Sequence, residues 1–185
     1  NYSVTVYDGT LTMEYGEAVA LEVTADSDSW TYNGQAHTLD SYTLKIGEGD
    51  PIAVGADGTY TFDNGDVLTV VVEGSITNVA ESDVTNAITS LTIMNGAEDV
   101  SGAYSVTQNN GTLTVTAKPV TVTANSEGFT YDGQPHSNAG YDVVGLVGQD
   151  AITAVVTGSI TYPSESPVTN VLTSYEFTAG TSSNY

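Results

Sequence analysis

The residues that could do chemistry in this sequence are, first, carboxylates crowded into predicted turns. Asp26 and Asp28 form an Asp-x-Asp pair, and Asp63 and Asp66 lie on either side of Asn64 in a second acidic turn. Calcium takes oxygen ligands from such loops, and calcium sites of extracellular proteins can be weak. The four aspartates are therefore candidate calcium ligands, although no ordered calcium-loop signature surrounds them. The competing interpretation is that they are solvated residues whose backbone tolerates turn conformations.

The two histidines, His37 and His136, occupy equivalent positions in a repeated motif, five residues after Tyr32 and Tyr131. A metal site needs several ligands close together, and each copy of the motif supplies one histidine. The sequence therefore favours turn residues that bond the backbone over metal ligands.

No arrangement of side chains indicates a catalytic site. Neither histidine has a serine or an acidic partner in the spacing of a nucleophile–base motif. Carboxylates are so abundant that a glycosidase-like pair would arise by chance, and no glycine-rich loop leads into a helix that could cradle a phosphate. We expect a protein that is not an enzyme and that has no cofactor apart from the calcium ion considered above.

The charge balance excludes several classes of partner. The chain has 185 residues with 23 acidic and 2 basic side chains, a formal net charge of −21. Nucleic acids and anionic membranes require Lys and Arg to neutralise their phosphates, so neither is an expected partner. No apolar run is long enough for insertion into a membrane. The absence of cysteine excludes disulfides and thiol chemistry.

An internal repeat positions these residues. Residues 30–37, Trp-Thr-Tyr-Asn-Gly-Gln-Ala-His, return at residues 129–136 as Phe-Thr-Tyr-Asp-Gly-Gln-Pro-His, an offset of 129 − 30 = 99. Repetition near this period indicates tandem copies of one small domain rather than one large fold.

The offset between the two copies changes further along the chain. Residues 74–77 return at residues 158–161, an offset of 158 − 74 = 84. The first copy therefore carries 99 − 84 = 15 extra residues, which we place around residues 46–57 as a loop or an extra hairpin on one edge. Removal of most of this segment is expected to leave the fold intact, because long surface loops cost little to shorten.

Alternating Val and Thr residues and twelve tyrosines are typical of β-strands, and no segment has a convincing helical period. Two hairpins are predicted: residues 1–14 around an Asp8-Gly9 turn, and residues 104–115 around an Asn110-Gly111 turn. Such dipeptides adopt the positive φ angles of a type I′ turn. The predicted fold class is all-β: two tandem small β domains, mainly antiparallel, either immunoglobulin-like sandwiches or β-grasp-like sheets.

Three segments are expected along the chain. Residues 1–14 are the closing hairpin of a preceding repeat or the opening strands of the first domain. Residues 15–118 are the first repeat domain with its insertion, and residues 119–185 are the second repeat domain without its closing hairpin. The linker ends at Pro119, since proline cannot donate to a β-ladder. Either residues 1–14 of another molecule complete the second copy by end-to-end strand exchange, or the hairpin opens each domain and both copies are complete.

Trp30 is the single tryptophan of the chain. An exposed tryptophan could stack on a sugar or anchor a protein partner. Its counterpart in the second copy, Phe129, is also aromatic, and aromatic side chains dominate protein cores. The sequence therefore favours a core position for both.

The order of these motifs resembles a known family. Three stretches carry the resemblance: residues 129–133 (Phe-Thr-Tyr-Asp-Gly), residues 158–161 (Gly-Ser-Ile-Thr), and Asn184-Tyr185 continued by a sequence such as residues 2–12 (Tyr-Ser-Val-Thr-Val-Tyr-Asp-Gly-Thr-Leu-Thr). In this order they are similar to the MBG and YDG-type repeats. These repeats occur in long surface proteins and adhesins of bacteria, including gut bacteria. The resemblance covers nearly the whole chain in two copies. The first copy departs from it in its insertion and at Trp30 and Asn33.

The resemblance implies tandem all-β modules in an extracellular stalk at the bacterial cell surface or cell wall, some linked with mucin or host adhesion, and no catalytic motif. We therefore expect a stalk or spacer of an adhesin whose partners are neighbouring repeats of the same chain. The alternative is a module that binds a host glycoprotein such as mucin, or an immunoglobulin. The insertion of the first copy would then carry the contact, because loops carry function.

Overall fold

The computed structural model describes residues 1–12 and 16–185. In these residues it contains β-strands and single-turn 3-10 helices but no α-helix, so the prediction of an all-β protein is confirmed. The chain divides into two compact units. The first comprises residues 1–27, 39–74 and 85–111, and the second comprises residues 28–38, 75–84 and 112–185.

One sheet of the first unit has the strand order β4-β3-β1-β9. Its strands are β1 (Val19–Ala25), β3 (Tyr42–Ile46), β4 (Ile52–Val54) and β9 (Tyr104–Asn109). β1 pairs antiparallel with β3, and β3 pairs antiparallel with β4. β1 and β9 are parallel, with Val19 opposite Tyr104.

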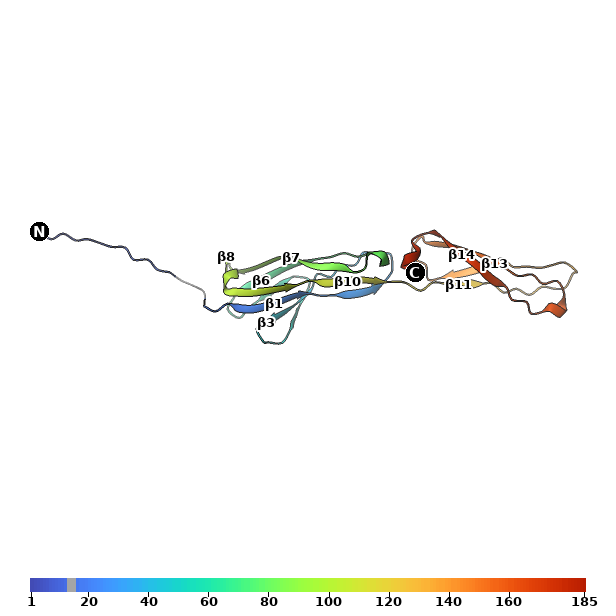
Figure 1. Cartoon of the computed structure of the whole chain (residues 1–185), viewed down its shortest axis with the longest axis horizontal. Coiled ribbons are helices and arrows are strands. Elements are labelled where there is room, and N and C mark those ends of the chain that lie inside the picture. Colours follow the sequence, from blue (N-terminus) through green and yellow to red (C-terminus); the bar gives the residue numbers. More distant parts are fainter. Residues whose placement is uncertain (13–15) are drawn as a thin grey trace. The chain divides into compact units, whose positions relative to one another are not determined.

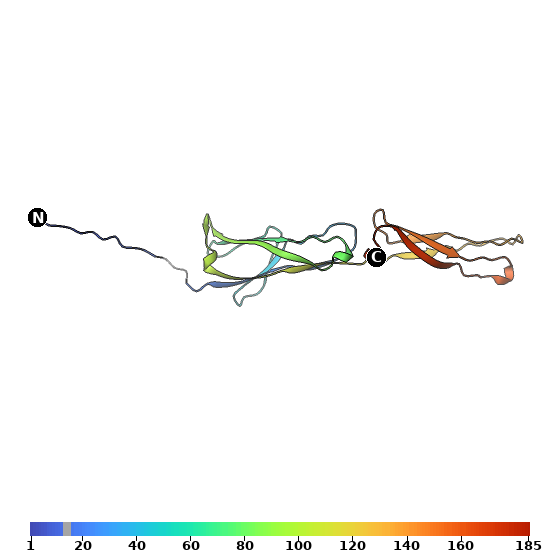
Figure 2. The same ribbon diagram turned by 45° about the horizontal axis from the view of Figure 1, so that its top comes forward.

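The remaining strands of the first unit pair antiparallel with one another. They are β5 (Thr59–Thr61), β6 (Val67–Glu73), β7 (Val84–Asn95) and the short β8 (Glu98–Asp99). β6 lies between β5 and β7, and β8 pairs with the end of β7. Figures 1 and 2 show β6 and the long strand β7 side by side. The single turn η2 (Ser101–Ala103) then leads into β9.

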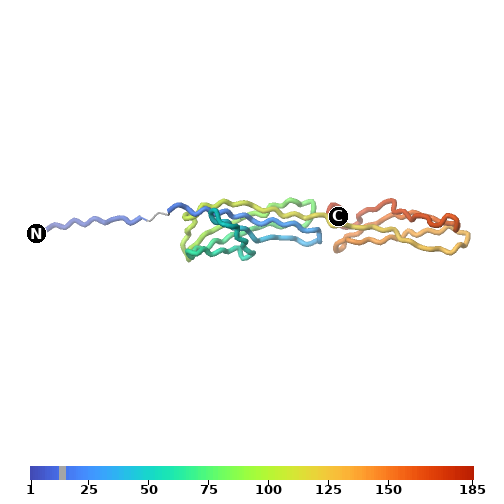
Figure 3. Tube along the Cα trace, turned by 90° about the horizontal axis from the view of Figure 1, so that it is seen from below, coloured from blue at the N-terminus to red at the C-terminus, as the bar shows by residue number. Residues whose placement is uncertain are grey.

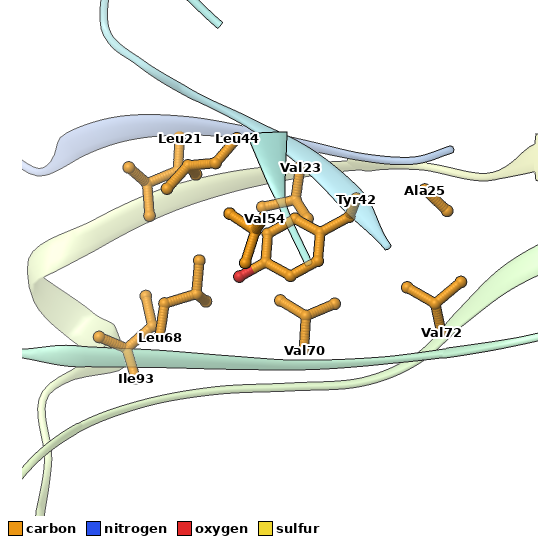
Figure 4. Close-up of a cluster of buried hydrophobic side chains, with 10 residues drawn as sticks. All are labelled: Leu21, Val23, Ala25, Tyr42, Leu44, Val54, Leu68, Val70, Val72 and Ile93. Carbon is orange, nitrogen blue, oxygen red and sulfur yellow. The ribbon is translucent and has the colours of Figure 1, made fainter. Parts of the chain in front are cut away.

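The core of the first unit forms between these two groups of strands. Alternate side chains of a strand point to opposite faces, which turns Leu21, Val23 and Ala25 of β1 to one side. Figure 4 shows them, together with side chains of β3 and β4, facing side chains of β6. The buried members of this cluster are Leu21, Val23, Ala25, Tyr42, Leu44, Val54, Leu68, Val70, Val72 and Ile93.

Tyr42 brings a polar atom into this core. Its side chain is 0% exposed, and its hydroxyl donates a hydrogen bond of 3.3 Å to the carbonyl oxygen of Gly58. Burial, with a smaller contribution from the nearby charge of Asp57, raises the pKa of Tyr42 to about 12. The phenol is therefore neutral at physiological pH, and its hydrogen bond satisfies a group that would otherwise be buried without a partner.

The extra residues of the first copy include β4, which lies at the edge of its sheet. An edge hairpin was one of the two forms predicted for this insertion. Its Val54 is 6% exposed and belongs to the core cluster. The expectation that most of residues 46–57 could be removed without harm is therefore wrong for β4, because the deletion would take a buried side chain out of the core.

Val54→Ala is expected to lower the free energy of unfolding by about 2 kcal/mol, from two lost methyl groups and the cavity that they leave. Urea unfolding followed by circular dichroism measures it. Ala53→Ser is the control, because Ala53 is exposed on the same strand and should change the stability little. An unchanged urea midpoint for Val54→Ala would contradict a core role for β4.

The second unit contains one parallel pair and two antiparallel pairs. β2 (Asp28–Thr31) and β10 (Gly111–Thr116) are parallel. β11 (Thr121–Ala124) pairs antiparallel with β12 (Tyr141–Val144), and β13 (Ala151–Thr157) with β14 (Val171–Ala179). Three single turns complete it: η1 (Val79–Glu81), η3 (Pro163–Glu165) and η4 (Ser182–Asn184).

The hairpin predicted at residues 104–115 does not form. β9 and β10 do not pair with each other; they pair in parallel with β1 and β2, at the same offset of 104 − 19 = 85 and 113 − 28 = 85. Neither Asn110 nor Gly111 has a positive φ, so the turn is absent. Strand directions are therefore mixed, and the prediction of a mainly antiparallel fold holds only in part.

Residues 1–12 form no strand, and every one of them is exposed. Figure 3 shows them as an extended trace. The hairpin predicted over residues 1–14 is thus not seen in residues 1–12, and the last two residues of that hairpin lie outside the described residues. Residues 117–120, at the predicted linker, also lie outside the strands. The proposed division into repeat domains stays a prediction.

Candidate functional site

Each copy of the repeated motif forms a small aromatic cluster around its histidine. The ring of His37 stacks on Trp30, with ring centroids 4.7 Å apart, and its Nε2 lies 3.1 Å from Oδ1 of Asn33. The ring of His136 stacks on Phe129 at 4.8 Å, and its Nε2 lies 2.9 Å from Oδ1 of Asp132. The histidines bond a side chain four residues earlier, whereas the prediction was a bond to the backbone.

Backbone bonds fix both histidines in the same way. The amide and carbonyl of His37 exchange hydrogen bonds with those of Ile76, and His136 does so with Ile160. In the second copy the amide of Gln134 and, to a lesser degree, His136 lower the pKa of Asp132. This arrangement orients the ring in each copy.

A glutamate closes the next turn in each copy. The carboxylate of Glu81 accepts hydrogen bonds from the amides of Thr77 and Asn78, and the carboxylate of Glu165 accepts them from Thr161 and Tyr162. These bonds lower the pKa of both glutamates, although for Glu81 the side chain of Asn78 is the largest cause. Both carboxylates cap the single turns η1 and η3, which is a structural role.

Sequence reasoning missed one asparagine in each copy, the buried Asn86 and the half-buried Asn170. Asn86 donates from Nδ2 to the carbonyl oxygens of Asp26 and Leu39, at 2.9 and 2.8 Å. Asn170 donates in the same way to Asn125 and Asn138, both at 2.8 Å. The Val-Thr-Asn motif that recurs at offset 84 was the signal. Each asparagine ties together two segments of backbone that the β-ladders leave unpaired.

In the structure, most of the predicted calcium ligands accept hydrogen bonds from other residues of the protein. Asp26 accepts hydrogen bonds from the hydroxyls of Ser41 and Thr43, and Asp28 accepts one from the amide of Ser29. Asp63 is exposed. Among the described residues, no group of three or more His, Cys, Asp or Glu side chains could hold a metal ion. The calcium site stays a prediction.

Asp66, the fourth predicted ligand, is buried under a polar network. Its carboxylate accepts hydrogen bonds from the hydroxyl of Tyr104 at 2.6 Å, from Asn95 at 2.7 Å and from Asn64 at 2.8 Å. The bond from Tyr104, followed by that from Asn95, lowers the pKa of Asp66. The network joins the residue just before β6 to β7 and β9. The burial of Asp66 is therefore explained by a structural role that needs no metal.

A groove opens beside the aromatic cluster of the second copy. Phe129, His136 and Ile160 line it, with residues 125–128 on one side and residues 166–170 on the other. Phe129 is 38% exposed and Tyr131 is 58% exposed. Their counterparts in the first copy are less exposed: Trp30 is half-buried and Tyr32 is 9% exposed. The predicted core position is therefore wrong for Phe129. For Trp30 it holds only in part, because the side chain is half-buried.

Comparison of the chain with protein-family models, with curated proteins and with solved structures finds no match. The resemblance to the MBG and YDG-type repeats therefore gains no support from them and stays a prediction. No helix in the described part of the chain is long and apolar enough to cross a membrane. The lining of the groove mixes aromatic and apolar residues such as Phe129 and Ile160 with polar residues such as Glu127.

Proposed function

We propose that this chain is a non-catalytic repeat module of a bacterial surface protein that acts as a stalk or spacer of an adhesin. The support is structural repetition. Both copies use the same histidine stack, the same glutamate cap and an asparagine that donates to two backbone carbonyl oxygens. Elements that recur with their hydrogen bonds intact are expected where the function is to extend a chain by repeated units.

The observation that carries the proposal is a network around Asn184 inside the second unit. Asn184 is 1% exposed. Its Nδ2 donates to Oδ1 of Asn78 at 3.0 Å, and its Oδ1 accepts from the amide of Val79 at 3.0 Å. Its carbonyl oxygen accepts from the amide of Lys118 at 2.9 Å. One residue, through its side chain and its backbone carbonyl, thus connects the η1 turn of the first copy, the linker and the η4 turn of the second.

Tyr185 adds an apolar contact to the same join. Its ring meets that of Tyr32 edge-on at 5.5 Å and stacks on Phe177 at 5.4 Å. Its hydroxyl accepts a hydrogen bond from the amide of Val147 at 2.9 Å and donates one to Asp150. Burial, followed by the bond to Asp150, raises the pKa of Tyr185 to about 12. A join of this kind resists bending, which a spacer requires.

The finer fold proposed for each copy is an immunoglobulin-like sandwich. In the first copy the β1 and β3 layer faces β6 across the core (Figure 4). Two facing layers of strands are the architecture of a sandwich, whereas a β-grasp sheet packs its core against a helix. The absence of an α-helix from the described residues favours the sandwich.

Asn184→Ala is expected to loosen the join while both copies stay folded. The chain has no cysteine, so spin labels can be attached at Ser75→Cys and Ser164→Cys, two exposed positions of the second unit, one in each copy. Electron-spin distance measurements should give a narrow distribution for the parent and a distribution at least twice as wide for Asn184→Ala. Ser183→Ala, an exposed neighbour in η4, should keep the narrow one. Equal widths in all three proteins would refute the stiff join.

A second candidate function is binding of a host glycoprotein such as mucin, or of an immunoglobulin. Tyr131 and Tyr162 are 58% and 54% exposed, with ring centroids 6.3 Å apart, and exposed aromatic rings can stack on sugars or anchor protein partners. Binding to immobilised mucin and pooled immunoglobulin, with and without calcium, tests this function. Saturable binding lost in Tyr131→Ala would favour the binding module over the spacer.

A further inference from the structure

The side chains that hold the buried carboxylate of Asp66 include two asparagines, and a glycine follows each of them. Asn95 donates from Nδ2 to Oδ1 of Asp66 at 2.7 Å, and Asn64 donates from Nδ2 to Oδ2 at 2.8 Å. The next residues are Gly96 and Gly65. A buried carboxylate is costly unless donors satisfy it, so a reaction that removes one of these amides would weaken the network.

Asparagine before glycine can lose its side-chain amide without an enzyme. The backbone nitrogen of the glycine gives up its proton to solvent and attacks the side-chain carbonyl carbon of the asparagine. A carbon–nitrogen bond forms, and the amide nitrogen takes a proton from solvent and leaves as ammonia. Water then opens the succinimide ring at one of its two carbonyls, which gives aspartate or isoaspartate. Glycine favours the attack because it has no side chain to hinder it.

Two of the four asparagine–glycine pairs are protected by the fold. The four pairs lie at residues 33–34, 64–65, 95–96 and 110–111. The amide of Gly65, which would have to become the nucleophile, donates to the carbonyl oxygen of Phe62 at 2.9 Å. Gly111 is buried at the start of β10, a strand that lies between β2 and β7. At both places the backbone must move before the attack is possible.

The pair at residues 95–96 lacks this protection. Asn95 is the last residue of β7, and Gly96 follows it in the turn to β8 with a positive φ of 59°. In the described part of the chain the amide of Gly96 donates no hydrogen bond. β8 has two residues and pairs with the end of β7, and so short a ladder opens at little cost. The nucleophile is therefore available at this pair.

We propose that Asn95 is a site of spontaneous deamidation, and that the reaction loosens the first copy by replacing a donor of the Asp66 network with a carboxylate. In the aspartate product a carboxylate oxygen would take the place of Nδ2, 2.7 Å from Oδ1 of Asp66. Two carboxylates that share a site repel each other unless one of them takes up a proton. The inference concerns covalent ageing of the chain and does not rest on the proposed spacer function.

The second copy shows the same carboxylate held without a reactive amide. Residues 119–185 contain no asparagine–glycine pair. At the offset of 84, Asp150 corresponds to Asp66, and Ala179 corresponds to Asn95. The hydroxyl of Tyr185 donates to Asp150. The second copy thus keeps a contact between a carboxylate and a phenol, and ageing by this route is expected to act on the first copy.

Asn33 offers a matched comparison, because its deamidation should be harmless. Among the described residues the amide of Gly34 likewise donates no hydrogen bond, so Asn33 should also react. Its Oδ1 accepts from the amide of Gln35 and lies 3.1 Å from Nε2 of His37. The counterpart Asp132 makes both of these contacts with one carboxylate oxygen. An aspartate at position 33 would therefore keep them.

Peptide mapping of the aged chain locates the reaction. The full chain is kept at alkaline pH, either folded or in urea. Cleavage after glutamate then places the four pairs on peptides 23–48, 49–73, 82–98 and 99–127, and mass spectrometry detects the exchange of NH2 for OH. In urea all four should react at similar rates. In the folded chain peptides 82–98 and 23–48 should react several-fold faster than the other two. A folded chain in which peptide 82–98 reacts no faster than peptide 49–73 would overturn the proposal.

Asn95→Asp tests the consequence of the reaction. Its urea midpoint, followed by circular dichroism, should be lower than that of Asn95→Ala, which loses the same hydrogen bond and adds no charge. The difference should shrink at mildly acidic pH, because one of the two carboxylates is then protonated. Asn33→Asp, the matched change at the harmless position, should keep the midpoint of the parent. A midpoint for Asn95→Asp at or above that of Asn95→Ala at neutral pH would refute the loosening.

Discussion

Tyr42→Ala is expected to lower the free energy of unfolding by about 3–5 kcal/mol, the range for removing a large aromatic side chain from a core. Tyr42 is 0% exposed and lies among Val23, Val54 and Val70 (Figure 4). Its removal would leave a cavity between two layers of strands, because the close-packed layers cannot collapse fully into the empty space. It would also leave the carbonyl of Gly58 without the hydroxyl that it accepts from. Urea unfolding followed by circular dichroism and by the fluorescence of Trp30 measures the loss.

Two variants separate the causes of this loss. Tyr42→Phe keeps the ring and removes one hydrogen bond, so it should cost about 1 kcal/mol. Tyr141→Ala changes the counterpart in the second copy, whose hydroxyl donates to Ile152 at 3.3 Å but whose side chain is only half-buried. It should cost about half as much as Tyr42→Ala, because less apolar surface is buried. Equal losses for Tyr42→Ala and Tyr141→Ala would contradict the difference in burial between the two copies.

The sequence predicted the features that depend on local patterns. Strands follow from alternation along a few residues, and the repeat follows from direct comparison of residues 30–37 with residues 129–136. The all-β class is confirmed for these reasons. The direction of strand pairing could not be predicted in this way, because β1 and β9 are 85 residues apart in the sequence and are brought together only by packing. No local pattern distinguishes a parallel partner from an antiparallel one at that distance.

Asn110-Gly111 shows how tertiary contacts override a turn propensity. The dipeptide is typical of a type I′ turn, but Oδ1 of Asn110 accepts a hydrogen bond of 3.1 Å from the amide of Ile88. Gly111 lies against the carbonyl oxygens of Ala25 and Asp26. The two residues therefore continue an extended strand. The sequence alone cannot tell a glycine needed for its φ angle from one needed for close approach of another backbone.

The sequence drew attention to two residues of the candidate site but did not predict the groove beside them. The motif drew attention to His37 and His136, and the structure stacks both on an aromatic ring. The exposure of Phe129 was not predictable from that motif, because its counterpart Trp30 has nearly the same neighbours in sequence. In the first copy β10 pairs with β2, the strand that contains Trp30, and this pairing depends on residues far from the motif in the sequence.

Gly111→Ala is expected to lower the free energy of unfolding by about 3 kcal/mol or more, at the upper end of what steric crowding in a core costs. The added Cβ would come within 2.2 Å of a carbonyl oxygen, and the atoms that it meets belong to the backbone of Ala25 and Asp26. A flexible side chain could rotate away. Ala25 and Asp26, however, lie in the chain between the β1–β9 ladder and the β2–β10 ladder, so their backbone can move only if a ladder opens. Urea unfolding measures the loss.

Gly55→Ala is the matched control for this prediction. Gly55 is exposed, has no positive φ and has nothing within 4 Å of an added Cβ, so alanine should leave the stability unchanged or raise it by about 0.4–1 kcal/mol through the unfolded state. A Gly111→Ala protein as stable as the Gly55→Ala protein would mean that the start of β10 does not approach the backbone of Ala25 and Asp26 this closely.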